Sequence, residues 1–440
     1  MSFLIDKQTV DELNLMGKFR QGSVSHLFNR VKTRGAEQLL DGMFRHLLVD
    51  AQAINRRSSI LSFFQSARLV FPFDVQQVTL MREYQDTTTA GNGLLVLGDT
   101  FIKKVLSSLT RDERYKKMVQ GLQATIVTLQ KCNAFVQSIP SANHAYADRI
   151  HAVQQILAKK ELIRLRETDI YQSLSVKKLS YYNHLLKTVL NKEMQELLNF
   201  VYEVDLYIAV SDVARAKGFS YACALAPEEN LLSAKGLAHP CIDKAIGNNL
   251  ELNVQNNVLF LTGANMAGKS TLMKAIGINL YLAHMGFPVA ATEMIFSVRD
   301  GMYSSINVAD NIGLGYSHFY AEVVRVKQAA VAAASGKRLL LMFDELFKGT
   351  NVKDAYDGTL AVTKGFVHYQ DCLFIVSTHI IEVAAALNDE DNVQFVYMPT
   401  VMDGLVPRYT YKLEKGITED RQGMMIINNE GILELLNAAD

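Results

Sequence analysis

The chain has 440 residues, enough for two or three domains that each bury a core. Hydrophobic residues make up 49% and charged residues 20%, a balance typical of globular proteins. No apolar run approaches the roughly 18 residues of a membrane span, so no membrane association is expected. The early charged residues of MSFLIDKQTVDEL argue against a secretory signal.

The scattered Cys132, Cys223, Cys241 and Cys372 form no C-x-x-C pair. A cytoplasmic protein with reduced thiols and no cysteine metal site is predicted.

The formal net charge is zero, but the two halves of the chain differ in charge. Residues 1–200 carry 27 Lys and Arg against 18 Asp and Glu, and the remaining residues carry 18 against 27. A basic half suggests contact with a polyanion such as a nucleic acid. Alternatively, the basic and acidic halves attract each other across a domain or subunit interface.

The first half of the chain is expected to be helical. Residues 1–70 place apolar residues three and four positions apart, and a loop rich in Thr, Gly and Asn follows at 86–93. From Gly93 to about Tyr207 the sequence is Leu- and Lys-rich, with Pro140 as one break. No fixed repeat is found.

The second half changes character near Gly218. Residues 219–255 indicate short strands and turns, and from Val258 a strand leads through a Gly-rich turn into a helix. The short apolar runs RLLLMFDE and CLFIVSTH are typical of buried parallel strands. Helical stretches separate them, which predicts an α/β domain with a central sheet.

The strongest motif is VLFLTGANMAGKST at 258–271. It fits the phosphate-binding loop (P-loop) pattern G-x-x-x-x-G-K-[ST], here Gly263–Ser270, between an apolar strand and a helix. Glycines allow backbone N–H groups to close around phosphates, and the helix N-terminus favours an anion. Lys269 would face the β- and γ-phosphates of ATP or ADP, and Ser270 would bind Mg²⁺. The alternative is a chance Gly-rich turn. The expected nucleotide-binding residues are Gly263, Asn265, Met266, Ala267, Gly268, Lys269, Ser270 and Thr271.

Two further strand ends carry polar residues that suit ATP hydrolysis. Asp344 ends an apolar run about 75 residues after the P-loop and is predicted to support Mg²⁺. Glu345 is predicted to polarise the attacking water. His379, in Ser377–Thr378–His379, would sense the γ-phosphate or orient that water. Each motif alone is common, and their succession makes the interpretation specific.

These residues resemble the MutS family. TGANMAGKST is similar to the family's TGPNMAGKST, with Ala264 in place of Pro, and GLAHP at 236–240 resembles the sequence that enters its ATPase domain. STH followed by Glu382 matches STH-x-x-Glu. Residues 310–327 resemble the family's signature segment, through Gly315, Ser317, Phe319 and Glu322. In the family this segment reaches the partner's nucleotide, which implies that Ser317 binds ATP across a dimer. A helix cap is the alternative role for Ser317.

The resemblance extends weakly to the N-terminal half. Residues 25–64 resemble the start of the family's lever domain, which implies a fold and no chemistry. The matching residues, expected to be packing residues, are Thr33, Gly35, Leu39, Ile54 and Arg57. The resemblance implies a multidomain α + α/β protein. An all-helical lever domain (1–205), with its DNA clamp reduced or absent, would precede a P-loop, ABC-like ATPase domain (206–440).

The chain also departs from the family pattern. Asp344–Glu345 is followed by Leu346–Asn351 (LFKGTN) and not by the usual Gly-Arg-Gly-Thr. No segment resembles the mismatch-reading domain. The only Phe-x-Glu, Phe343–Glu345, lies in the phosphate site and is not expected to correspond to the family's Phe-x-Glu wedge. No Smr-like nuclease is expected at the end of the chain. These features suggest a short, divergent MutS-like branch.

The expected function is that of a dimeric, DNA-associated ATPase related to mismatch repair, dimerising through its ATPase domains and using ATP and Mg²⁺. The alternative is an ATP-driven switch on a protein or RNA assembly without direct DNA contact. A structural dimer without catalysis is disfavoured because Lys269, Ser270, Asp344, Glu345 and His379 are all present. An SMC- or ABC-type ATPase is disfavoured because no Leu-Ser-Gly-Gly signature occurs.

Overall fold

The computed structural model describes residues 2–17, 19–87, 93–110, 113–140, 143–169, 175–264, 266–306, 318–403 and 406–418. These residues form a mixed α and α/β architecture in two compact units. Unit 1 comprises Met1–Phe28, Met43–Ser58 and Val213–Asp440, and unit 2 comprises Asn29–Gly42 and Ser59–Asp212. In the part of the chain that is described, no helix has both the length and the apolar character to cross a bilayer.

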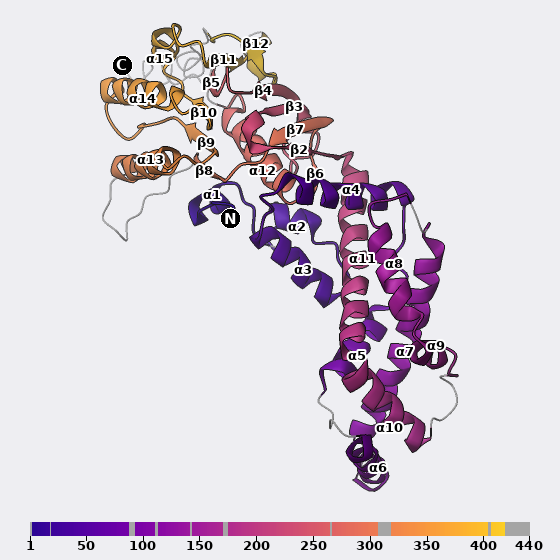
Figure 1. Cartoon of the computed structure of the whole chain (residues 1–440). Helices are drawn as coiled ribbons and strands as arrows, with labels where there is room; N and C mark the ends of the chain where they lie inside the picture. Colours follow the sequence, from indigo (N-terminus) through magenta and orange to yellow (C-terminus); the bar gives the residue numbers. More distant parts are fainter. Residues whose placement is uncertain are drawn as a thin grey trace. The chain divides into compact units, whose positions relative to one another are not determined.

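Unit 2 is helical, as the sequence predicts for this region (Figure 1). The unit boundaries fall inside its first two helices and its last one. Its helices are α3 (Arg34–Arg45), α4 (Ala51–Ala67), α5 (Val75–Asp86), α6 (Gly93–Thr110), α7 (Arg114–Ser138), α8 (Ala147–Leu157), α9 (Lys160–Arg166), α10 (Val176–His184), the π-helical turn η1 (Leu185–Val189) and α11 (Asn191–Lys217).

The apolar residues spaced along these helices form one core that joins α5, α7, α8, α10 and α11. Small residues allow two close approaches. A Cβ at Gly121 would lie 2.6 Å from Tyr84, and one at Gly35 would lie 2.3 Å from the Tyr202 ring. Asp205 accepts hydrogen bonds from the backbone N–H and the hydroxyl of Thr33 (2.6 and 2.7 Å), which fixes the chain where α3 begins. Thr33 and Gly35 are therefore packing residues.

Unit 1 contains the α/β part of the chain. Its helical elements are α1 (Lys7–Glu12), α2 (Val24–Phe28), the 3-10 turn η2 (Pro227–Glu229), α12 (Lys269–His284), α13 (His318–Ala334), α14 (Val352–Val367) and α15 (Ile381–Ala386). Its strands are β1 (Ser220–Tyr221), β2 (Cys223–Leu225), β3 (Leu232–Leu237), β4 (Asn248–Leu252), β5 (Val258–Gly263), β6 (Pro288–Val289), β7 (Glu293–Ser297), β8 (Gly301–Ser305), β9 (Leu339–Asp344), β10 (Leu373–Ser377), β11 (Val393–Met398), β12 (Thr400–Asp403), β13 (Val406–Tyr409) and β14 (Glu414–Lys415).

The principal sheet has the strand order β14-β11-β5-β10-β9-β8. Strands β11, β5, β10, β9 and β8 are parallel, and only the edge strand β14 is antiparallel. A mixed sheet, β2-β7-β3-β4, and the short pairs β1-β6 and β12-β13 complete the unit. Because β5, β10 and β9 are adjacent and parallel, their carboxyl ends meet at one edge.

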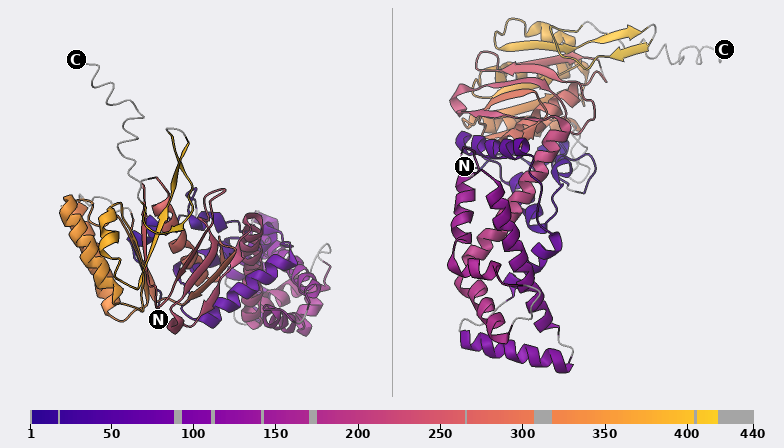
Figure 2. Two further views of the ribbon diagram at one scale, coloured as in Figure 1. Left: turned by 90° about the horizontal axis from the view of Figure 1, so that it is seen from above. Right: turned by 90° about the vertical axis from the view of Figure 1, so that its right-hand side faces the viewer.

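Strand β9 shows how the sheet is covered. Its residues are buried on both faces, as expected of a parallel strand. Leu341 and Phe343 point into a core with α13, α14 and α15, which lie together on one side of the sheet (Figure 1 and Figure 2). Met342 points the other way, toward α12, where a Cβ at Gly277 would lie 2.7 Å from its methyl group. Since side chains alternate along a strand, Asp344 also points toward α12.

Candidate functional site

The loop between β5 and α12 has the backbone that a phosphate-binding loop requires. Gly263 and Gly268 have φ angles of +144° and +104°, which favour glycine. A Cβ at Gly268 would also lie 3.0 Å from the Tyr411 ring. Met266 is exposed at φ +71°, Ala267 is buried, and Asn265 lies outside the described residues. The N–H groups at the start of α12 are therefore available to an anion at this turn.

Lys269 is the first residue of α12 and is buried. Its Nζ donates hydrogen bonds to the carbonyl oxygens of Gly263 (2.8 Å) and Ala264 (3.1 Å). Burial lowers its pKa, and the charges of Glu345 and Asp344 partly oppose that shift. The ammonium group is thus held in the loop by two carbonyls, which a phosphate oxygen would replace as its partner.

Ser270 and Asp344 meet although they are 74 residues apart. The Ser270 hydroxyl donates to Oδ2 of Asp344, whose Oδ1 is buried without a hydrogen-bond partner in the described part of the chain. Burial raises the pKa of Asp344, and the neighbouring Glu345 adds to that rise. A hydroxyl beside a carboxylate with an unused buried oxygen suits the oxygen ligands of Mg²⁺. Thr271 follows in the same helical turn.

Glu345 and His379 lie beyond the tips of β9 and β10. Glu345 has a φ of +51°, and its N–H donates to the carbonyl of Ser377 (2.8 Å). Its Oε1 lies 3.5 Å from Nδ1 of His379. This contact lowers the pKa of Glu345 and raises that of His379. The carboxylate is therefore ionised near neutral pH and lies next to a partly exposed imidazole.

A cavity of about 380 Å³ adjoins the P-loop, with Gly268 and Leu272 in its wall. Its other lining residues include His239 of the GLAHP sequence, Ile246 and Tyr411. Burial, and secondarily Lys274, lowers the pKa of His239 to about 4, so its ring is neutral. A cavity of this size with mainly apolar walls suits a flat organic group such as a nucleobase.

The Tyr411 side of this cavity is fixed through one buried amide. Asn248, the first residue of β4, donates to the carbonyl of Tyr411 (3.0 Å) and accepts from the N–H of Leu413 (2.7 Å). Tyr411 has a φ of +57°. The segment after β13 is thereby held against the P-loop, far from it in sequence.

The signature residues are only partly described. Ser317 and Gly315 lie outside the described residues, whereas Phe319 and Glu322 lie on α13. Phe319 packs against the loop that follows Glu345: its ring centroid lies 6.0 Å from that of Phe347, and a Cβ at Gly349 would lie 3.1 Å from its N atom. The divergent LFKGTN segment is therefore shaped to fit α13 of the same chain.

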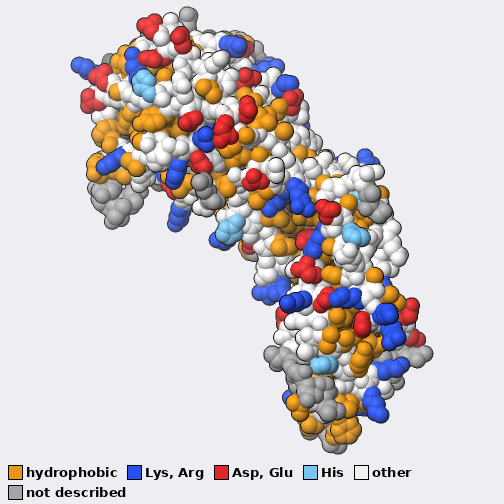
Figure 3. All heavy atoms as spheres, in the orientation of Figure 1, with side chains coloured by type: hydrophobic (Ala, Val, Ile, Leu, Met, Phe, Trp, Pro, Cys, Tyr) orange, Lys and Arg blue, Asp and Glu red, His pale blue; other side chains and the backbone are white. Residues whose placement is uncertain are grey.

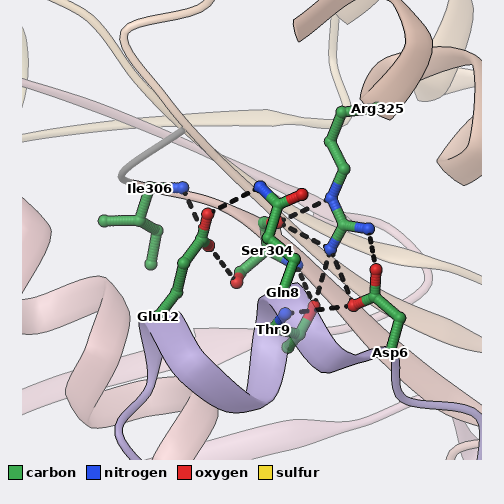
Figure 4. A network of polar contacts seen from close by, with 7 residues as sticks. All are labelled: Asp6, Gln8, Thr9, Glu12, Ser304, Ile306 and Arg325. Carbon is green, nitrogen blue, oxygen red and sulfur yellow. Dashed lines mark hydrogen bonds and ion pairs between the residues drawn. The ribbon is translucent and has the colours of Figure 1, made fainter. Parts of the chain in front are cut away.

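Helix α13 is also tied to the N-terminal segment (Figure 4). The guanidinium of Arg325 forms an ion pair with Asp6 and donates to the hydroxyl of Thr9 (2.7 Å) and the carbonyl of Ser304 (2.8 Å). Glu12 accepts from the Ser304 hydroxyl and from the N–H of Ile306 (3.1 Å). One buried network thus holds the chain on both sides of residues 307–317.

The comparison with known families addresses this region directly. A family model of MutS domain V matches residues 259–439. The DNA mismatch repair protein MutS of Pseudothermotoga lettingae is 25% identical over 317 residues, which cover 68% of this chain and 37% of that protein. Residues 259–439 belong to the MutS domain V family. Similarity to MutS proteins extends over about two-thirds of the chain.

Other MutS relatives give the same result. The DNA mismatch repair protein MutS of Listeria monocytogenes is 25% identical over 61% of this chain, and that of Streptococcus agalactiae is 28% identical over 65%. The matched region spans about a third of the length of these relatives. The resemblance inferred from the sequence is confirmed at the level of the family.

The structure brings five residues of the MutS domain V match to one edge of the principal sheet: Lys269, Ser270, Asp344, Glu345 and His379. His239 and Tyr411 could not be identified as cavity residues from the sequence, because nothing in their spacing points to the P-loop. The contact between Arg325 and Asp6 was not predictable either. A lone arginine on a helix otherwise rich in apolar residues was the only signal in the sequence.

Proposed function

We propose that this MutS-family chain binds ATP at the loop between β5 and α12 and hydrolyses it to ADP and phosphate. The contact between Ser270 and Asp344, with Lys269 at the preceding position, is the observation that carries the proposal. Lys269 and Ser270 follow the loop after β5, and Asp344 ends β9. The sheet order β5-β10-β9 brings these two segments close together. Members of the MutS family are ATPases, which supports the assignment at the level of the family.

In this proposal the phosphates of ATP lie along the P-loop and the base enters the cavity beside Tyr411. Lys269 leaves its carbonyl partners and faces the β- and γ-phosphates. A Mg²⁺ ion held by Ser270 and Asp344 would neutralise charge on the phosphate oxygens. Glu345 accepts a proton from the water that attacks the γ-phosphorus, the bond to the β-phosphate oxygen breaks, and ADP and phosphate form. His379 orients Glu345.

The wider functional role is also a proposal. Two copies would associate through their ATPase regions (206–440), each placing Ser317 at the other's γ-phosphate, so that ATP binding closes the dimer. The helical region (1–205), which includes unit 2 except for its last residues 206–212, would act as a lever. Its segments 1–28 and 43–58 are packed within unit 1. The protein would act in the cytoplasm.

Contact with duplex or branched DNA is proposed from the charge of the first 200 residues. Their excess of Lys and Arg favours a polyanion. On the face shown in Figure 3, Lys and Arg side chains are distributed along the helical unit with Asp and Glu among them. Such a distribution supports contacts to phosphates and not the reading of bases.

The test combines ATP turnover with nucleic-acid retention. Steady-state ATPase activity is measured with and without Mg²⁺, and filter binding is measured for duplex, branched and single-stranded DNA and for RNA, with ATP or ADP, over a salt series. DNA retention that falls steeply with salt supports the proposal, because phosphate contacts release counterions. ATPase activity with no retention of any DNA would favour the alternative, an ATP-driven switch on a protein or RNA assembly.

A further inference from the structure

A second cavity, here called the distal cavity, lies within unit 2 and has a volume of about 410 Å³. Residues of α5, α6, α7, α10 and η1 line it. Four cations, Lys103, Arg114, Lys117 and Lys187, and one carboxylate, Glu83, line it. Lys103 forms an ion pair (2.5 Å) with Asp99, which is not a lining residue, so the lining still carries more positive than negative charge. This excess of positive charge around one small cavity favours a negatively charged occupant, because like charges that lie close together repel each other.

Lys187 is held at this cavity by an unusual backbone. It lies in the π-helical turn η1, and π-helical turns are rare and occur often at functional sites. Its Nζ lies 4.1 Å from the centroid of the Tyr84 ring and donates to the Thr87 hydroxyl. It forms no ion pair within the described part of the chain. Burial, and next the charge of Lys103, lowers its pKa to about 8.

The other side of the cavity supplies both polar and apolar contacts. The Tyr84 hydroxyl is buried and has no hydrogen-bond partner among the described residues. Its pKa is raised by burial, so it stays protonated. Leu80 and the buried Met118 add apolar surface. Lys117 lies in the first turn of α7, where free backbone N–H groups add positive potential.

We propose that the distal cavity binds a small phosphomonoester, with the phosphate between Lys187 and Lys117 and the organic part against Tyr84, Leu80 and Met118. A dianion would offset the surplus of cations. The volume is that of a site for a small organic molecule, so a bound molecule of sugar-phosphate to nucleotide size fits it, whereas a DNA duplex does not. This site uses no residue of the P-loop and does not depend on ATP hydrolysis.

Ribose 5-phosphate is the probe, because it presents a phosphomonoester without a base or a di- or triphosphate. Its binding is measured by isothermal titration calorimetry on the full chain, with ribose as the uncharged control. The variants are Lys187→Met and Lys117→Gln, with Lys192→Gln, an exposed lysine of α11, as the matched control. Lys269→Ala is included because it impairs the P-loop and leaves the distal cavity intact.

Binding of ribose 5-phosphate and not of ribose is expected, weakened about tenfold or more in Lys187→Met and Lys117→Gln, which corresponds to about 1.4 kcal/mol. The Lys192→Gln and Lys269→Ala variants should bind as the wild type does. Lys117→Gln changes an exposed side chain, so its folding is preserved even if Lys187→Met is unstable. No binding, or equal binding by wild type and Lys117→Gln, would overturn the proposal. So would loss of binding in Lys269→Ala alone, because the probe would then occupy the P-loop.

A competition arm separates a small ligand from nucleic acid. A duplex oligonucleotide without terminal phosphates is added to the titration. Unchanged ribose 5-phosphate binding supports a small-molecule site. Displacement of the probe, together with duplex binding that is weakened by Lys117→Gln, would instead assign these cations to phosphodiesters and sink the proposal.

Discussion

Oε1 of Glu345 lies 3.5 Å from Nδ1 of His379, and the two residues follow neighbouring strands, β9 and β10. Glu345 adopts a positive φ, a conformation uncommon for a residue with a side chain, immediately after Asp344. The side chains of two successive residues, Asp344 and Glu345, therefore contact different partners. Asp344 points toward Ser270, and Glu345 turns toward His379.

Glu345→Gln should bind ATP and hydrolyse it slowly. The amide keeps the size of the side chain and loses the carboxylate that accepts a proton from water. Single-turnover rates should fall by about 10²-fold or more, a magnitude usual for the loss of a general base. Nucleotide affinity, measured with a fluorescent ATP analogue, should stay near that of the wild type. If Glu345→Gln hydrolyses ATP at the wild-type rate, Glu345 is not the general base, and His379 becomes the next candidate.

Lys269→Ala should weaken ATP binding or turnover at least about tenfold, equivalent to about 1.4 kcal/mol. The change removes the charge that faces the phosphates and leaves Gly263 and Gly268 to shape the loop. Steady-state ATPase activity and equilibrium nucleotide binding measure the effect. Unaltered values for both would refute the P-loop assignment.

In the wild type, the free energy of unfolding should decrease as the pH rises, because the buried carboxyl of Glu322 must ionise. Glu322→Gln should lack this decrease. Burial raises the pKa of Glu322 from 4.5 to about 7. The folded state then binds more protons than the unfolded state between these two values, so the free energy of unfolding decreases as pH rises through this window. Urea midpoints measured at a series of pH values report the effect.

The matched control is Asp357→Asn, which changes an exposed carboxylate of α14. Its urea midpoints should follow those of the wild type at every pH. If wild type and Glu322→Gln show the same dependence between pH 4.5 and 7, the buried carboxyl does not titrate as stated.

Mixing two defective chains tests whether Ser317 acts on the nucleotide of a partner. Ser317→Ala and Lys269→Ala chains should each have low activity alone. If the signature acts in trans, a mixed dimer holds one site with both defects and one intact site, so activity should partly return. If subunits exchange and mixing restores nothing, Ser317 acts as a helix cap, whose loss costs about 1 kcal/mol of stability.

No preference for mismatched over matched duplex is expected of this chain. No segment of it resembles the wedge that stacks at an unpaired step. Competition binding between the two duplexes measures the ratio of affinities. A preference above about tenfold, about 1.4 kcal/mol, would mean that the helical unit reads DNA deformability.

Local patterns in the sequence were sufficient to predict the α/β half and the P-loop strand and helix. A Gly-rich turn between an apolar run and a helix leaves few alternative structures, and the strands 258–263, 339–344 and 373–377 lie where short apolar runs predicted them. The helical character of residues 93–207 was also predictable from spacing, whereas the π-helical turn at Lys187 was not, because it depends on packing.

Contacts between distant segments could not be predicted. The hydrogen bond that Asn248 donates to the carbonyl of Tyr411 holds Tyr411 at the cavity wall, and this pairing across 163 positions leaves no periodic trace in the sequence. The strand order that unites Ser270 with Asp344 is likewise a tertiary property. The Mg²⁺ roles expected of the P-loop serine and of the strand-end aspartate supplied that pairing as an expectation. The residues that depart from the family pattern gave no guide to their neighbours.

The pairing of the N-terminus with β8 has a consequence for how the protein behaves when damaged. Leu4 hydrogen-bonds to both Asp300 (2.7 Å) and Met302 (2.9 Å), and a Cβ at Gly301 would collide with its carbonyl oxygen. These few residues cover the outer edge of the principal sheet. Proteolytic loss of the first dozen residues would uncover β8, and an uncovered edge strand is a template for pairing with another chain. Clipped molecules should therefore self-associate, either by edge-to-edge aggregation or by accepting the N-terminal segment of a neighbour in a domain swap.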